Sequence, residues 1–240
     1  MLEYSDDSKS YGETLYAESN HRIANNLTLV AGFLEQQARL LERRGETIGP
    51  DEVRMLLSEA SVRVAAAGEL HRLLITRHDG TVELGAFLKI VSRQAVDAMT
   101  EPGCIDLVVS ADNCVMPADV AHKAGLIAGE LIVNAIKYAH PAAEVSGRIE
   151  VGCACQADGS TLIWVSDDGV GLPVGFDPKT CNGVGMRTMR AIARQLGAQL
   201  AFNDTGVGLT VQLRVPGKSA GIPVPGLTPA GMSWPPLHSI

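Results

Sequence analysis

Apolar residues near the start of the chain recur at the three- and four-residue steps of an amphipathic helix. This heptad spacing predicts a helix from about Thr14 to Arg44, roughly 45 Å long at the usual rise per residue. Gln37 is the one polar break in the stripe, whose apolar members are Ile23, Leu27, Val30, Leu34 and Leu41. An apolar stripe of this length must be covered by another element.

A second helix with the same spacing follows a short turn at Gly45 to Gly49. Its start at Pro50-Asp51-Glu52 places a proline in the first turn and two acids at the positive end of the helix dipole. Two such helices joined by a short loop form a helical hairpin, which alone leaves part of each stripe exposed. We therefore expect a homodimer in which two hairpins form a four-helix bundle. The second stripe comprises Val53, Leu57, Ala60, Val64, Ala67 and Leu74.

The pattern changes near His78-Asp79-Gly80, after which short β-rich runs alternate with helices. We expect helices at 84–99, 117–139 and 186–196, and strands at 105–110, 148–156, 161–166, 200–203 and 209–215. The expected fold has two domains, an all-α hairpin and an α/β (α+β) sandwich with helices on one face of a mixed sheet. The expected boundaries are 1–79 for the hairpin, 80–216 for the sandwich, and 217–240 for a flexible tail rich in proline and glycine.

The composition excludes several classes of protein. Apolar residues make up 46% of the chain and charged residues 20%, which argues against disorder, and the net charge of −7 indicates no basic surface for nucleic acid. The longest apolar stretch, Ala124 to Ala139, carries Glu130, Asn134 and Lys137, so no membrane span is expected. Five cysteines without disulfide spacing, and no secretory signal, favour a reducing, cytoplasmic location.

Two cysteines have a spacing that bears on metal binding. Cys153 and Cys155 would share one face of a strand, but no second pair accompanies them, which argues against a metal site.

Four polar residues follow one another along the helix expected at 117–139. Glu130, Asn134 and Lys137 recur at steps of four and three, so they share a helix face, and Tyr138 follows directly. The carboxylate and the carboxamide offer oxygen donors for Mg²⁺, and the ammonium suits a phosphate. The alternative is a helix with one solvated edge.

Two glycine-containing segments also have features that suit a bound nucleotide. Asp167-Asp168-Gly169-Val170-Gly171 follows a strand, where a carboxylate can accept a hydrogen bond from an exocyclic amine and glycines let the backbone approach a flat base. By itself this pattern is also compatible with a simple turn. Gly183-Val184-Gly185-Met186 opens a helix, so free amides and the positive dipole end suit phosphate. Its spacing differs from a P-loop and from the dinucleotide fingerprint.

A third segment, Gly208-Leu209-Thr210, enters the last strand. We expect the hydroxyl of Thr210 to support the aspartate of the preceding segment.

In order and spacing these segments resemble the GHKL ATP-binding fold of histidine kinases, DNA gyrase and the Hsp90 chaperones, over roughly Thr81 to Pro216. The resemblance implies Asn134 as a Mg²⁺ ligand, together with Glu130, and Asp167 as the carboxylate that reads adenine. Gly169 and Gly171 would lie beneath the base, and Gly183 and Gly185 would frame a lid at about 172–182.

Glu130 departs from the asparagine that many histidine kinases have at this position. Glutamate also occurs there in the HWE and HRXXN kinase subtypes, and GHKL ATPases use it to activate water. ATP hydrolysis therefore stays open from this motif.

The first helix contains His21-Arg22-Ile23-Ala24-Asn25-Asn26-Leu27. His21 lies two residues before the stripe position Ile23, so its imidazole should face solvent, where it titrates near neutrality and offers a lone pair to a γ-phosphate. This segment resembles the phosphoacceptor box of the HRXXN histidine kinases. The resemblance implies that His21 is autophosphorylated from ATP and passes the phosphoryl group to an aspartate of a response-regulator receiver domain.

The same resemblance extends to two neighbours of the histidine. Arg22 and Asn25 would orient the phosphate or a water molecule, and Asn25 would assist dephosphorylation of the regulator. His71, on the stripe of the second helix, is expected to be structural.

Three other functions compete with a kinase: a histidine phosphotransferase with a decayed nucleotide site, an anti-sigma-type regulator kinase on the same fold, and a plain ATPase. Because only 20 residues precede His21, we expect either a chain that begins at an internal methionine or a separate sensor protein as partner.

Overall fold

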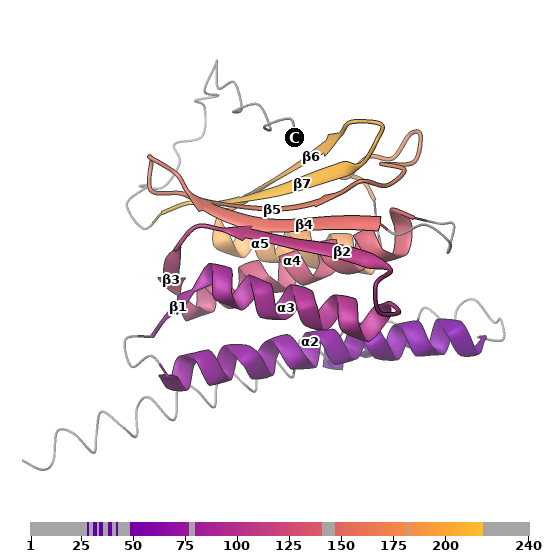
Figure 1. Cartoon of the computed structure of the whole chain (residues 1–240), viewed down its shortest axis with the longest axis horizontal. Coiled ribbons are helices and arrows are strands. Elements are labelled where there is room, and N and C mark those ends of the chain that lie inside the picture. Colours follow the sequence, from indigo (N-terminus) through magenta and orange to yellow (C-terminus); the bar gives the residue numbers. More distant parts are fainter. Residues whose placement is uncertain are drawn as a thin grey trace, which may run out of the picture.

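The computed structural model describes residues 49–76, 80–140, 147–181 and 183–217, with eight single residues before them (Figure 1). Those eight are all helical and exposed, within the range expected for the first helix: Thr28, Ala31, Gly32, Leu34, Glu35, Ala38, Arg39 and Glu42. His21, Arg22 and Asn25 lie outside the described residues, as does the tail beyond residue 217.

Helix α2 spans Pro50–Thr76, which confirms the expected start at Pro50. The amide of Val53 donates to the carbonyl of Gly49 at 3.1 Å and closes the first turn. One face of the helix is buried through Glu59, Val62 and Ala66. The opposite face carries three members of the expected stripe, whose residues are 41%, 61% and 47% exposed: Val53, Leu57 and Val64.

The described residues after α2 contain seven strands, in two sheets. The five-stranded sheet has the order β2-β4-β5-β7-β6, in which β2 and β4 are parallel and the other neighbours are antiparallel. A separate antiparallel pair, β1 and β3, lies where the chain enters the domain. The strands are β1 (Thr81–Glu83), β2 (Ile105–Ala111), β3 (Val115–Pro117), β4 (Gly147–Cys155), β5 (Thr161–Asp167), β6 (Gln199–Asp204) and β7 (Leu209–Val215).

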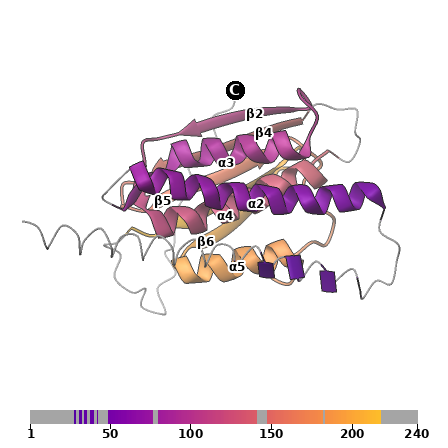
Figure 2. The same ribbon diagram turned by 90° about the horizontal axis from the view of Figure 1, so that it is seen from below.

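Helices α3 (Leu84–Met99), α4 (Ala118–Tyr138) and α5 (Val184–Leu196) form one layer on the sheet. Figures 1 and 2 show α2 on the far side of this layer, along α3 and α4, so the molecule has the order sheet, three helices, α2. The fully buried side chains of Phe87, Ile127 and Ile149 lie in the continuous core between sheet and helices. The expected α+β sandwich is confirmed.

Local sequence explains most element ends. The Glu83 carboxylate accepts from the amides of Gly85 and Ala86 and caps α3. Gly197 ends α5 with φ 61°, a left-handed conformation that glycine adopts at little cost. Several bounds differ from expectation by one or two residues: α4 spans Ala118–Tyr138, with Pro117 as its N-cap, and α5 begins two residues earlier, at Val184. Strands β2, β4, β5 and β6 are extended or shifted by one residue.

Candidate nucleotide site

The polar edge of α4 is turned inward rather than toward solvent. Glu130 is 7% exposed, and Asn134 and Lys137 are half-buried. The side chain of Asn134 has no hydrogen-bond partner among the described residues, so its amide oxygen is available to a ligand. Tyr138 is exposed, and the Nζ atom of Lys137 lies 5.9 Å from the centroid of its ring.

Two residues of α2 reach this edge. The guanidinium of Arg63 forms an ion pair with the carboxylate of Glu130, and the ammonium of Lys137 forms one with the carboxylate of Glu59, which is 4% exposed. A second Arg63 nitrogen lies 4.0 Å from Glu59. Four charges of alternating sign thus join α2 to the polar edge of α4, largely out of contact with water.

Burial and charge act on the Glu130 carboxyl in opposite directions. Burial raises its pKa, because the charged form loses hydration, while the neighbouring Arg63 lowers it. The net shift is upward, so Glu130 binds a proton more readily than an exposed glutamate does.

Asp167 ends β5 and points to the turn that follows. Its Oδ1 atom accepts hydrogen bonds from the amides of Gly169 at 3.0 Å and Leu209 at 3.3 Å. Burial raises its pKa, and these two amides act against that shift. Because Oδ2 makes no hydrogen bond within the described residues, the second oxygen of the carboxylate is open to a donor from a ligand.

The glycines of this turn are required by close neighbours. A Cβ on Gly169 would overlap the backbone of Ala139, at the C-terminal end of α4. Gly171 has φ 71°, and a Cβ there would overlap the carboxylate of Asp204, which accepts from the amide of Leu172 at 3.0 Å. The turn after β5 is therefore packed directly against the end of α4.

The N-terminus of α5 approaches the same helix near Glu130, in the middle of α4. Gly183 is its N-cap, and a Cβ on Gly185 would lie 2.7 Å from Oε2 of Glu130. The polar edge of α4 therefore runs from Gly185 at one end to Gly169 at the other. The nine residue steps from Glu130 to Ala139 measure about 14 Å along a helix, a span comparable with an extended nucleoside triphosphate.

The segment expected as a lid, at about 172–182, is held by an arginine of α5. Arg190 donates from Nη1 to the carbonyls of Pro178, at 3.1 Å, and Lys179, and from Nη2 to the carbonyl of Cys181 at 2.6 Å. One side chain thus ties the C-terminal part of this segment to the helix that follows it. No motif in the sequence singled out Arg190.

In the structure Gly185 lies against Glu130 and Gly169 lies against the end of α4, with Asn134 and Lys137 between them on the same helix. Thr210 has a different hydrogen-bond partner from the one expected. Its buried hydroxyl shares a hydrogen bond of 2.7 Å with Ser166 rather than with Asp167. Sequence reasoning missed Glu59 and Arg63 as well as Arg190. The i,i+4 spacing of Glu59 and Arg63 was the one available signal.

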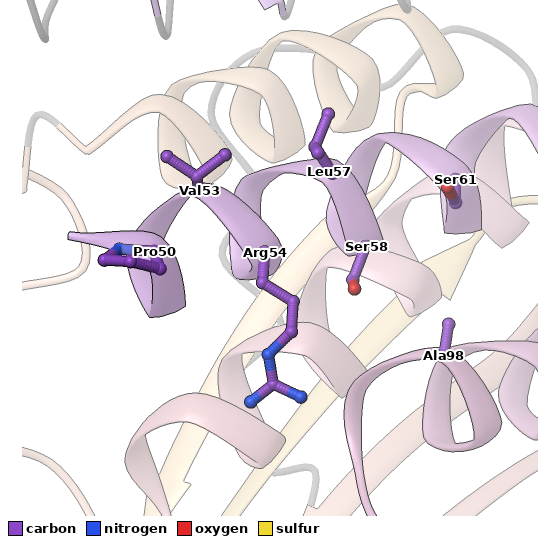
Figure 3. A pocket seen from close by; sticks show the side chains of 7 residues that line it. All are labelled: Pro50, Val53, Arg54, Leu57, Ser58, Ser61 and Ala98. Atoms are coloured by element: carbon purple, nitrogen blue, oxygen red, sulfur yellow. The ribbon is translucent and has the colours of Figure 1, made fainter. Parts of the chain in front are cut away.

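One groove in the described part of the chain lies away from this edge. Figure 3 shows it on the N-terminal half of α2, beside the end of α3 at Ala98, with a volume of about 690 Å³. Arg54 and Ser58 point toward Ala98, while Val53 and Leu57 point away from it. This groove contains none of the residues that the sequence assigns to the nucleotide.

None of the helices in the described ranges is both long and apolar enough to cross a bilayer.

Comparison with known proteins matches two families along the chain. Residues 18–99 match a family described as histidine kinase, and residues 119–219 match the histidine kinase-, DNA gyrase B-, and HSP90-like ATPase family. The second match contains the whole candidate site on α4, β5 and α5.

Individual relatives of this chain are also histidine kinases. The blue-light-activated histidine kinase 2 of Erythrobacter litoralis is 27% identical over 210 residues, which cover 83% of this chain and 56% of the relative. The sensor histidine kinase PdtaS of Mycolicibacterium smegmatis is 30% identical over 205 residues, covering 83% of this chain and 39% of the relative. The chain thus spans little more than half of one relative and less than half of the other.

A solved structure shows the same fold. It is the histidine kinase domain of the Erythrobacter litoralis EL346 blue-light activated histidine kinase, with a TM-score of 0.63 at 24% identity, covering 87% of this chain and 95% of that one. Taken with the two consecutive family matches and the ATPase fold around α4, these similarities show that the chain belongs to the histidine kinase family.

Proposed function

We propose that this protein is an ATP-dependent histidine autokinase of a two-component system, which phosphorylates His21 and passes the phosphoryl group to an aspartate of a response-regulator receiver domain. It also dephosphorylates that regulator, with the aid of Asn25. The observation that carries the proposal is the polar edge of α4, held between the glycine turn after Asp167 and the N-terminus of α5.

Each part of this site has a role that suits one part of ATP. The free oxygen of Asp167 accepts a hydrogen bond from the exocyclic amine of adenine, with Gly169 and Gly171 below the ring. At the other end, the amides near Gly183 and Gly185 bind the phosphates, and Lys137, nearer the adenine end of the edge, adds a positive charge. These assignments rest on the residues' positions along α4, β5 and α5.

The donor set also suits Mg²⁺. The unpartnered amide oxygen of Asn134 and the carboxylate of Glu130 lie one helical turn apart, and Mg²⁺ takes one or two protein oxygens and completes its shell with phosphate and water. Magnesium, when bound there, would spread the charge of the triphosphate. Glu130 would have to exchange part of its contact with Arg63 for this ligand.

Phosphoryl transfer would then be a matter of positioning. A ring nitrogen of His21 attacks the γ-phosphorus in line, the bond to the bridging oxygen breaks, ADP leaves, and the ring proton passes to solvent. Arg22 would orient the incoming phosphate. Because His21 and the nucleotide belong to different domains, we place the boundary at 79/80 and expect the domains to approach one another there. Residues 217–240 form the tail.

The outward face of α2 supports a homodimer. Val53, Leu57 and Val64 form an exposed apolar row on the side opposite the catalytic domain, where the first helix and a second copy can complete a four-helix bundle. A separate sensor protein would deliver the signal in the cytoplasm.

The proposal is tested with γ-labelled ATP and purified protein. Label that is acid-labile and absent from His21→Ala supports it, and so does loss of Mg·ATP binding in Asn134→Ala with the oligomeric state unchanged. Acid-stable label, or label that persists in His21→Ala, contradicts the phosphoacceptor. Steady phosphate release without any phosphoprotein would instead identify an ATPase.

A further inference from the structure

Three of the five cysteines gather at the end of the sheet opposite Asp167. Cys155 is the last residue of β4, and Cys114 lies in the connection between β2 and β3. Their Sγ atoms are 2.6 Å apart. Non-bonded sulfur atoms do not ordinarily approach so closely, and a small displacement brings the pair to the 2.05 Å of a disulfide bond.

The three thiols differ in their exposure to solvent. Cys155 is exposed, whereas Cys114 and Cys153 are each 1% exposed. Burial raises the pKa of the Cys153 thiol to about 11 and that of Cys114 further still. Because the thiolate is the reactive form, Cys155 is the thiol that a dissolved oxidant meets first, and Cys114 is the nearest thiol to resolve it.

We propose that Cys114 and Cys155 form a reversible disulfide under oxidising conditions. With a low-molecular-weight disulfide such as oxidised glutathione, the thiolate of Cys155 attacks one glutathione sulfur and releases the first glutathione. The thiol of Cys114 then loses its proton and attacks the sulfur of Cys155, and the second glutathione leaves. Two protein thiols are oxidised, and one glutathione disulfide is reduced to two thiols.

The bridge would join the main sheet to the point where the chain enters the catalytic domain. The carbonyl of Cys114 accepts from the amide of Leu84 at 2.8 Å, and the residue after Cys114 begins β3, which pairs with β1. A covalent link from β4 to this connection therefore restrains β1 and the start of α3. The nucleotide turn at Asp167 lies at the opposite end of β5 and is not restrained.

The test treats the full-length protein with oxidised glutathione and digests it with trypsin without reduction. Cleavage places Cys104 and Cys114 in one peptide and Cys153 and Cys155 in another, so matched variants identify the pair. A cross-link between these peptides that survives in C104S and C153S but disappears in C114S and C155S supports the proposal. A cross-link that persists in C155S, one that joins two molecules, or only mixed disulfides with glutathione would overturn it.

Hydrogen exchange tests the consequence of the bridge. Oxidation should slow exchange at the amide of Leu84 several-fold in the wild type and leave it unchanged in C155S, while ATP affinity stays the same in both. Equal exchange rates before and after cross-linking would show that the bridge does not restrain the domain entrance.

Discussion

The guanidinium of Arg63 on α2 is paired with the carboxylate of Glu130 on α4, although 67 residues separate them in the chain. Glu130 is a residue that the sequence motifs assign to nucleotide chemistry, and Arg63 belongs to the helical hairpin. Together with the Lys137–Glu59 pair, this contact makes the hairpin a direct neighbour of the nucleotide helix. A nucleotide bound at the proposed site on α4 would therefore be linked to the position of α2 through these charges.

Replacing one partner of this buried pair should destabilise the folded protein. In Arg63→Met the carboxylate of Glu130 stays buried without its cation, so we expect the free energy of unfolding to fall by about 3 kcal/mol. The double variant R63M/E130Q should recover most of that loss, because no unpaired charge remains. Urea unfolding of the two single variants and the double variant measures the coupling.

Arg72 supplies the control for this experiment. It lies on the same helix, its side chain is 75% exposed and its partner is Glu69 on α2, so Arg72→Met should cost less than about 1 kcal/mol. Additive losses in R63M/E130Q, or equal losses in R63M and R72M, would contradict a coupled buried pair.

Asp167 and its neighbour Asp168 should differ sharply in their effect on ATP affinity. Asp167→Asn removes the charged acceptor proposed for adenine, so we expect ATP binding to weaken by about 10- to 100-fold. Asp168 instead accepts from the amide of Arg148 at 2.8 Å and lies 2.8 Å from Nε2 of His140. Asp168→Asn should change the dissociation constant less than about threefold. Calorimetric titration with ATP compares them, and equal effects would count against Asp167 as the adenine reader.

Arg190 should control the order of the segment it binds. Arg190→Ala removes hydrogen bonds to three carbonyls, so exchange of the amides at 179–181 should accelerate and the KM for ATP should rise several-fold. Arg194 is the matched control, because it lies one turn further along α5 and its Nε donates only to the carbonyl of Arg190, at 3.3 Å. If R194A loosens the segment as much as R190A does, the carbonyl contacts are not what holds it.

His122 makes the fold sensitive to acid. It is 7% exposed, neither ring nitrogen has a hydrogen-bond partner within the described part of the chain, and burial, with Lys123 adding to it, lowers its pKa from 6.5 to about 4. As the pH falls below 6.5 the unfolded chain takes up a proton that the folded protein resists, so stability declines until about pH 4 and then levels. The total contribution is about 3 kcal/mol.

The measurement is a series of thermal or urea unfolding curves between these pH values. His122→Leu should flatten the dependence, while His140→Gln, which leaves His122 in place, should retain it. A slope that is unchanged in H122L would assign the acid sensitivity to other groups.

Local signals were sufficient for most secondary structure. The bounds Leu84–Met99 of α3 were predicted at both ends, and the end of α5 at Gly197 followed from the glycine that stops it. These features depend on residues within a turn or two of one another, which is the range over which propensity, capping and periodicity act. The polar edge of α4 was visible for the same reason, since Glu130, Asn134 and Lys137 share one helix face.

Contacts between distant elements were not predictable in this way. Glu59 and Arg63 looked like an ordinary i,i+4 pair, because the sequence does not show which face of α2 meets the catalytic domain. Cys114 was likewise invisible as a neighbour of Cys155 until the parallel pairing of β2 with β4 placed the two connections together. Thr210 was assigned to Asp167 by proximity in the motif, whereas the strand register pairs it with Ser166.

Helix α2 is packed on one side through Val62 and Arg63 and exposed on the other along Val53, Leu57 and Val64, so it can transmit a rotation from one side to the other. Consecutive residues of an α-helix are about 100° apart around its axis, and a rotation of α2 moves both of its faces together. A rotation that a partner imposes on the exposed side would displace the charges of Glu59 and Arg63 relative to α4. The signal would then reach α4 through these ion pairs and not through the covalent linker between the domains.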